Sequence, residues 1–154
     1  MAKFASGDRR IYTVLVGDLF HYGHVQFLKR ARSLGDYLIT GVVQDNVARA
    51  YKRTPILTLD ERIQVIAACR YVDEAWEMTE ALDNDFMRRH NLHRYVYAVA
   101  DDTEDERIKS AHNKRLDSHY FHRIAYTPGI STTSIITRVL QRDELCQEVT
   151  PIDV

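Results

Sequence analysis

Two histidines, His21 and His24, stand three residues apart where an apolar run gives way to a helical pattern. Both imidazoles can face one point at the start of that helix, where free backbone N–H groups and the helix dipole favour an anion. Gly23 lets a phosphate approach the backbone closely, and imidazoles can stabilise charge that develops on a phosphoryl group. We therefore expect a phosphate-binding segment that also includes Gly17 and Asp18. A pair of ordinary capping or core histidines is the alternative.

The His-x-x-His spacing could instead chelate a metal ion. No third cysteine, histidine or carboxylate stands at an obvious helical or hairpin spacing from His21 and His24. The two cysteines, Cys69 and Cys146, are far apart and have no paired ligand spacing. We therefore expect no protein-bound metal site.

A second candidate site is the run Gly129-Ile130-Ser131-Thr132-Thr133, which precedes the last helical pattern. Three consecutive hydroxyl groups at a helix start offer both side-chain and backbone donors to an anion. Simple N-capping needs only one hydroxyl group. The run after a glycine therefore favours phosphate binding.

Further charged residues follow the predicted second and fourth strands. Lys52 and Arg53 lie in a basic segment that we expect to be a loop, and a lysine ammonium there could close over phosphates or simply be solvated. Arg62 is either an anion clamp or a surface residue of a helix. Asp101 and Asp102 could orient a base, hold Mg²⁺ or cap the next helix.

Alternating strand and helix patterns must position these segments. Apolar runs rich in β-branched and aromatic residues predict buried strands at residues 11–16, 37–43, 71–76, 95–100 and 120–126. Apolar periodicity and capping residues predict helices at residues 22–34, 58–70, 82–90, 104–116 and 131–141. The alternation predicts an α/β protein, with a Rossmann-like, doubly wound, five-stranded parallel sheet and helices on both faces. Ligands of such sheets bind beyond the carboxyl ends of the strands.

The length of 154 residues fits one domain with a single core. We expect a flexible N-terminal arm over residues 1–10, a globular domain over 11–142 and a C-terminal tail over 143–154. The formal net charge of −1 argues against nucleic acid or a membrane surface as the main partner. No stretch reaches transmembrane length, and no apolar leader precedes the domain, so we expect a cytoplasmic protein.

Taken together, these residues resemble the cytidylyltransferase family of the nucleotidyltransferase superfamily, which includes glycerol-3-phosphate, phosphocholine and phosphonate cytidylyltransferases. The landmarks occur in the family's order over residues 12–140. The segment His21-Tyr22-Gly23-His24 is similar to the signature His-x-Gly-His, and residues 129–133 are similar to the carboxyl-terminal signature. The block Arg70-Tyr71-Val72-Asp73-Glu74 favours the cytidylyl branch over adenylyl relatives.

The resemblance implies transfer of CMP from CTP, bound with Mg²⁺, to a small phosphate- or phosphonate-bearing acceptor, with release of pyrophosphate. It implies catalytic roles for His21, His24 and Lys52, and it implies a homodimer. It also implies a nucleotide-binding set made of Gly17, Asp18, Gly23, Arg62, Asp101, Gly129, Ile130, Ser131, Thr132 and Thr133. An adenylyltransferase that uses ATP and a catalytically silent nucleotide-binding module are the alternatives.

Two departures from the family pattern bear on the acceptor. The family's Gly-x-Phe-Asp is Leu15-Val16-Gly17-Asp18 in this chain, so the glycine is displaced. Tyr126 stands where the family often has an arginine that contacts phosphate. Either another basic residue replaces that cation, or the acceptor differs from the common ones. The candidate acceptors are phosphocholine, phosphoethanolamine, glycerol 3-phosphate and small phosphonates.

Overall fold

The computed structural model describes residues 7–112 and 115–142. The predicted tail and residues 1–6 of the predicted arm lie outside the described residues. The strands are β1 (Arg10–Leu15), β2 (Tyr37–Val42), β3 (Glu74–Glu77), β4 (Arg94–Val99) and β5 (Phe121–Ala125). The helices are α1 (Tyr22–Arg32), α2 (Asp45–Tyr51), α3 (Leu59–Ala67), α4 (Asn84–Arg89), α5 (Asp102–His112) and α6 (Thr132–Leu140), with a 3₁₀ turn over Ser118–Tyr120.

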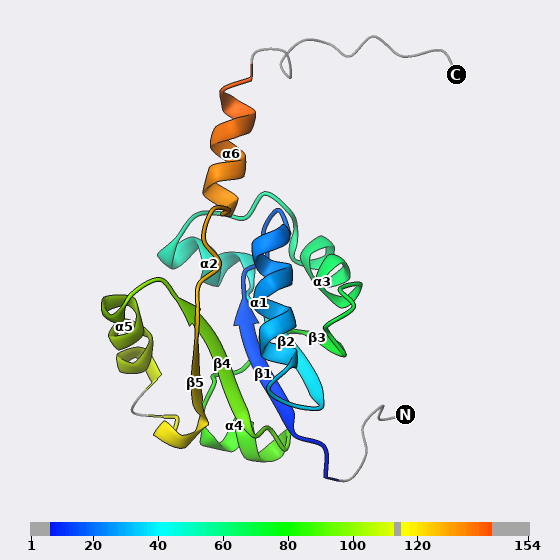
Figure 1. Cartoon of the computed structure of the whole chain (residues 1–154), viewed down its shortest axis with the longest axis vertical. Coiled ribbons are helices and arrows are strands. Elements are labelled where there is room, and N and C mark those ends of the chain that lie inside the picture. The colour runs from blue at the N-terminus through cyan, green and yellow to red at the C-terminus, as the bar shows by residue number, and fades with distance from the viewer. Residues whose placement is uncertain (1–6, 113–114, 143–154) are drawn as a thin grey trace.

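The five strands form one sheet in the order β3-β2-β1-β4-β5, and every pairing is parallel. The order reverses at β1, which lies between β2 and β4 (Figure 1). The connections between successive strands carry helices, as parallel pairing requires. The prediction of a Rossmann-like, doubly wound sheet is confirmed, and the point of reversal is where such sheets bind ligands.

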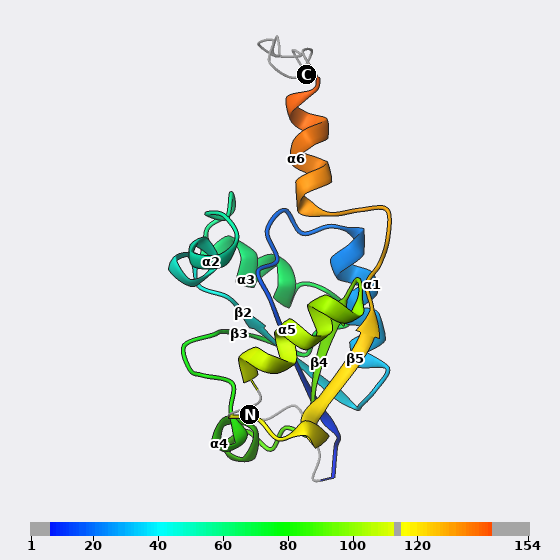
Figure 2. The same ribbon diagram turned by 90° about the vertical axis from the view of Figure 1, so that its left-hand side faces the viewer.

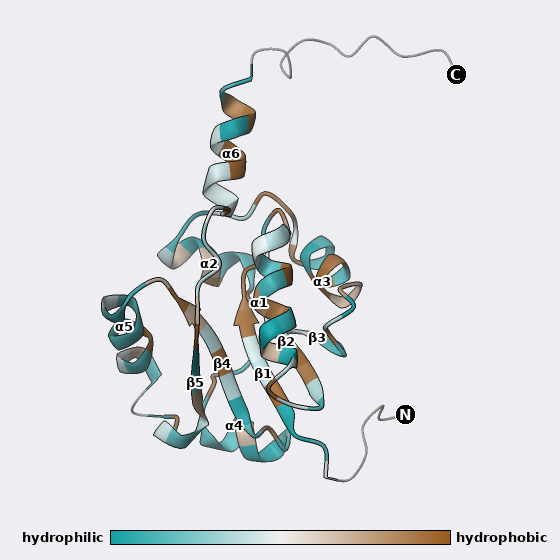
Figure 3. Ribbon diagram, viewed as in Figure 1, coloured by the Kyte–Doolittle hydropathy of each residue, from teal (hydrophilic) through white to brown (hydrophobic). Residues whose placement is uncertain are grey.

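Side chains of the central strands alternate between two cores, one on each face of the sheet. Ile11, Leu38 and Val96 pack with Leu28 of α1 in one core. The next residue along β1, Tyr12, belongs to a more aromatic core on the other face; its members from β2, α4 and β4 are Tyr37, Ile39, Phe86, Met87, Tyr95, Tyr97 and Val99. Burial on both faces explains why the central strands read as mostly apolar runs, and in Figure 3 the head of the β1 arrow is brown, the colour of apolar residues.

Helix α6 differs from the other helices in its position. It extends away from the sheet in two perpendicular views (Figures 1 and 2), and none of its residues is buried. Only its beginning lies near the carboxyl ends of the strands. Helix α6 therefore contributes to that edge through its first turn.

Two predicted elements are wrong in detail. The basic segment after β2 was expected to be a loop, but it begins as helix α2, with the Lys52 N–H donating to the Ala48 carbonyl at 3.0 Å. The third strand was expected from residue 71 and begins at Glu74. Val72 is held in a turn after α3, where its N–H donates to Cys69 O at 2.9 Å. The first strand begins at Arg10, one residue before the expected start of the domain.

Candidate active site

A cleft of about 700 Å³ opens at the carboxyl end of β1 and continues toward β4 and α6. It is lined by nine of the residues predicted to form the site: Gly17, Asp18, His21, Gly23, His24, Lys52, Ser131, Thr132 and Thr133. These residues come from three segments that are far apart in the sequence. The fold therefore brings together the histidine motif, the basic segment and the hydroxyl run.

The two histidines cap helix α1 together. His21 Nδ1 accepts a hydrogen bond from Gly23 N–H at 3.1 Å, and His24 Nδ1 accepts one from His21 N–H at 3.2 Å. Their ring centroids are 3.9 Å apart. Because each Nδ1 accepts from an amide, the proton of each neutral ring is assigned to Nε2. The pair therefore offers two Nε2–H donors.

Both imidazoles are held in the neutral form. Burial, followed by the charges of His21 and Lys52, lowers the pKa of His24 to about 3. Burial also lowers the pKa of His21. Neutral rings at neutral pH act as hydrogen-bond donors to an anion without carrying a net charge.

The loop between β1 and α1 depends on a glycine at position 17. Gly17 has a φ of +71°, and a Cβ there would lie 2.5 Å from Ile66 Cδ1. Leu19, two residues on, also has a positive φ of +46°. The displaced glycine of this chain is thus required by the local backbone and by the packing of α3.

Gly23 is a second position where a side chain would not fit. A Cβ there would lie 2.9 Å from the His21 ring and 3.1 Å from Ile130 Cγ2. The close approach joins the starts of α1 and α6. Thr132 strengthens the same junction, because its hydroxyl donates to the Asp18 carbonyl at 2.9 Å.

The start of α6 is capped as predicted. Ser131 Oγ accepts from Ser134 N–H at 3.0 Å, and Ser134 Oγ accepts from Ser131 N–H at 2.9 Å. The hydroxyl of Thr133 accepts from the guanidinium of Arg53 at 3.2 Å. A cation from the basic segment therefore reaches the first turn of α6.

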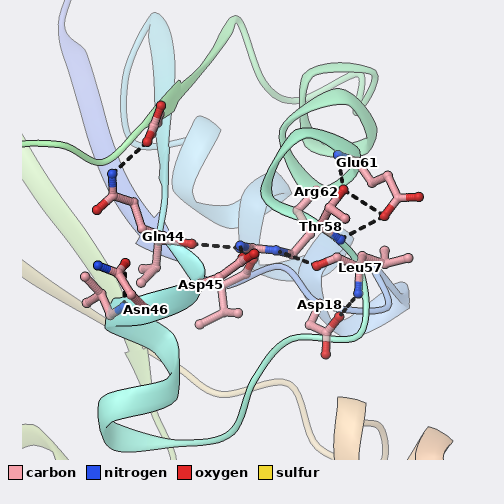
Figure 4. Close-up of polar contacts among 12 residues, drawn as sticks. Asp18, Gln44, Asp45, Asn46, Leu57, Thr58, Glu61 and Arg62 are labelled. Carbon is pink, nitrogen blue, oxygen red and sulfur yellow. Dashed lines mark hydrogen bonds and ion pairs between the residues drawn. The ribbon is translucent and has the colours of Figure 1, made fainter.

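Four predicted site residues do not line the cleft. Arg62 is completely buried beneath it and donates to main-chain carbonyl groups (Figure 4). Asp101 caps α5, since its carboxylate accepts from Glu104 N–H at 2.8 Å. Gly129 forms the turn before α6 with a φ of +85°, and Ile130 packs against Gly23.

Other lining residues were not assigned to the site from the sequence, although Tyr126 was noted there as a departure from the family pattern. Tyr51 ends α2 and is 52% exposed, and Tyr126 is 44% exposed. Glu104 lies in the first turn of α5, where its carboxylate accepts from Ala100 N–H at 2.9 Å. Glu104 could have been predicted from its place shortly after the fourth strand, because ligands of such sheets bind at the carboxyl ends of the strands.

Within residues 7–112 and 115–142, no group of three or more histidines, cysteines and acids is arranged to hold a metal ion. One carboxylate oxygen at the cleft wall is buried without a hydrogen-bond partner among the described residues. It is Oδ2 of Asp18, a residue that is 5% exposed and lines the cleft.

No helix within residues 7–112 and 115–142 is long and apolar enough to cross a membrane.

Residues 17–138 match the cytidylyltransferase-like family, so the chain belongs to that family. The match includes the histidine motif, the basic segment and the hydroxyl run. The family predicted from these motifs is thereby confirmed.

Several similar curated proteins are named as cytidylyltransferases. The chain is 32% identical over 149 residues to the ethanolamine-phosphate cytidylyltransferase of Arabidopsis thaliana, which covers 91% of this chain and 34% of that protein. It is 42% identical over 89 residues to a probable ethanolamine-phosphate cytidylyltransferase of Encephalitozoon cuniculi, over 57% of this chain and 27% of that protein. It is 32% identical over 141 residues to choline-phosphate cytidylyltransferase A of Mus musculus, over 86% of this chain and 36% of that protein. The chain thus spans about a third of the length of these relatives.

A solved structure shares the fold. The lipopolysaccharide core biosynthesis protein of Thermoplasma volcanium superposes with a TM-score of 0.64 at 24% identity, over 79% of this chain and 99% of that one. At this identity the likeness supports the α/β architecture alone.

Proposed function

We propose that the protein is a nucleotidyltransferase that moves CMP from CTP to a small phosphate-bearing acceptor and releases pyrophosphate. The main support is that two helices, α1 and α6, begin at the same cleft. Neither has an acidic residue in its first turn. The first amides of a helix have no partner within the helix and carry a partial positive charge. Two such starts beside Lys52 and Arg53 suit a chain of phosphates.

In this proposal the side chains act by position and charge. Nε2–H groups of His21 and His24 donate to the α-phosphate, where charge builds as the acceptor oxygen attacks in line. Lys52, which also lines the cleft, places its ammonium charge against the phosphates. The hydroxyl groups of Ser131 and Thr133 and the first amides of α6 hold the departing pyrophosphate, while the Thr132 hydroxyl stays bonded to the Asp18 carbonyl. No covalent enzyme intermediate is required.

Arg53 can replace the phosphate-binding arginine that the family often has at the position of Tyr126. The family's arginine is absent there, yet Arg53 Nη1 contacts Thr133 at the start of α6. A guanidinium in this place can bind phosphate oxygens in the arginine's stead. The substitution at Tyr126 therefore does not require an unusual acceptor.

Mg²⁺ would enter with CTP, held mainly by phosphate oxygens and water. The Oδ2 atom of Asp18 is the kind of ligand that Mg²⁺ prefers, and it would hold the ion directly or through water. The ion would neutralise charge on the triphosphate. Orientation and proton placement would remain with the protein side chains.

Phosphoethanolamine is the first acceptor we propose, because several of the most similar relatives are named as ethanolamine-phosphate cytidylyltransferases. The test is pyrophosphate release with CTP and Mg²⁺, using phosphoethanolamine, phosphocholine, glycerol 3-phosphate and 2-aminoethylphosphonate. We expect release with CTP and little with ATP. A clear preference for ATP would make the protein an adenylyltransferase, and binding of CTP without release would make it a nucleotide-binding module.

The homodimer and the cytoplasmic location stay predictions from the sequence. Gel filtration with light scattering tests the first of them. A mass close to the 17.9 kDa of one chain would contradict it.

A further inference from the structure

Arg62 gathers four groups from three separate segments around one guanidinium group. Its side chain is 0% exposed. Nη1 donates to the carbonyls of Val16 at 2.6 Å and Val43 at 2.8 Å, which follow β1 and β2. Nε donates to Leu57 O at 3.2 Å, and Nη2 pairs with the Asp45 carboxylate in the first turn of α2 (Figure 4).

A second anchor lies 11 residues further along the same stretch of chain. Asp18 Oδ1 accepts from the amides of Ile56 and Leu57, each at 3.0 Å. Asp18 belongs to the loop that leads into the histidine motif. The stretch of residues 45–57 is therefore tied to the core at its beginning through Asp45 and at its end through Asp18.

Between these two anchors the chain has few other tertiary contacts, one of which is the bond from Arg53 to the Thr133 hydroxyl. Helix α2 has seven residues, of which only Ala48 is buried. A helix this short is unstable in water without tertiary contacts. Lys52 and Arg53, the cations of the cleft, follow directly and are exposed.

We propose that Asp45 and Arg62 are positioning residues, which fix α2 so that Lys52 stays over the phosphate-binding part of the cleft. The inference rests on the proposed function, because it assigns the contact to the transfer reaction. Arg62 acts from beneath the cleft and touches no substrate. Loss of the Asp45 contact frees the start of α2 while the three carbonyl bonds of Arg62 remain.

The test is a double-mutant cycle with Asp45→Ala and Lys52→Ala. Asp45 is the better site for substitution, because its side chain is 42% exposed, whereas truncation of fully buried Arg62 could unfold the protein. We expect Asp45→Ala to lower kcat/KM for CTP by about tenfold to a hundredfold, which is the scale of a small misplacement. In the Lys52→Ala background the same change should cost less than about threefold, because the group it positions is gone.

Asp85→Ala is the matched control, since it removes an exposed ion pair with Arg88 on α4. It should leave kcat/KM unchanged. Asp45→Asn, which keeps an acceptor oxygen, should recover part of the rate. An equal loss from Asp45→Ala with and without Lys52, or no loss at all, overturns the proposal.

Hydrogen exchange separates this inference from the proposed function. Asp45→Ala should speed amide exchange in peptides that cover residues 45–57 and leave those that cover α4 unchanged. Unchanged exchange over 45–57 overturns the anchoring role even if the enzyme is active. If the wild-type protein transfers no nucleotide, the proposed function fails, and the exchange result alone decides whether Asp45 and Arg62 hold α2.

Discussion

Helices α1 and α6 begin without an acidic residue in the first turn, whereas α2, α3, α4 and α5 each carry at least one. The α1 and α6 starts are capped by neutral groups, His21 and Ser131, and both line the cleft. At α3 the first turn already contains Asp60 and Glu61, which satisfy the helix dipole within the protein. The acid-free starts keep their electrostatic attraction for an external anion.

Helix α5 sharpens the contrast, because it too begins at the cleft. Its first turn carries Asp102, Glu104 and Asp105, and Glu104 lines the cleft. A carboxylate there would repel phosphate. Under the proposed function, we therefore expect the phosphate chain of CTP to lie at the starts of α1 and α6.

The largest expected effect comes from breaking the α1 start. His24→Ala should lower kcat by on the order of 10²–10³-fold, because the lost Nε2–H donor acts mainly in the transition state. The Kd for CTP should rise by less than about tenfold. Steady-state kinetics and calorimetry measure the two quantities, and His119→Ala, an exposed histidine outside the cleft, is the control. Preserved turnover with a large loss of binding would refute this role for His24.

A smaller effect should follow when α6 is made to resemble the other helices. Thr133→Glu puts an acid in its first turn, beside Arg53, and should weaken CTP binding by on the order of tenfold or more. The new carboxylate would repel the phosphates and would pair with the Arg53 guanidinium. Thr133→Gln has a similar size without the charge and should weaken binding much less. Equal affinities for the two variants would show that α6 does not meet the phosphates.

The smallest effect concerns stability and pH. His24 has a pKa of about 3 in the folded protein, against an ordinary value of 6.5. Between these values the unfolded chain binds a proton that the folded chain does not, so stability is complete above about pH 6.5 and falls as the pH decreases. The free energy of unfolding should lose up to about 1.4 kcal/mol per pH unit from this residue. Urea unfolding at pH 7.5, 6 and 5 should show a shallower loss for His24→Asn, and identical slopes would contradict the assignment.

Most of the architecture could be read from the sequence, because the strands of this sheet are buried on both faces. Runs such as residues 11–16 are mostly apolar for that reason. Helix α2 was not predicted from the sequence. It buries only Ala48 and thus has no apolar stripe, and it is held by Asp45 through an arginine 17 residues away.

The candidate site divides in the same way. The histidine motif and the hydroxyl run were readable because each is a local cap at the start of its own helix. Arg62 was assigned to the nucleotide, and nothing local reveals that its partners Val16 and Val43 lie 46 and 19 residues away. Burial that is created by distant segments cannot be inferred from one stretch of sequence.

The most direct test of phosphate binding at α1 and α6 is a titration of ¹⁵N-labelled protein with CTP and Mg²⁺, followed by amide chemical shifts. We expect the largest shifts on residues 21–24 and 131–134, at the two acid-free helix starts, and little change at the start of α3 over residues 58–61. Largest shifts at the start of α3 or α4, or none at α6, would contradict the claim that α1 and α6 together hold the phosphates.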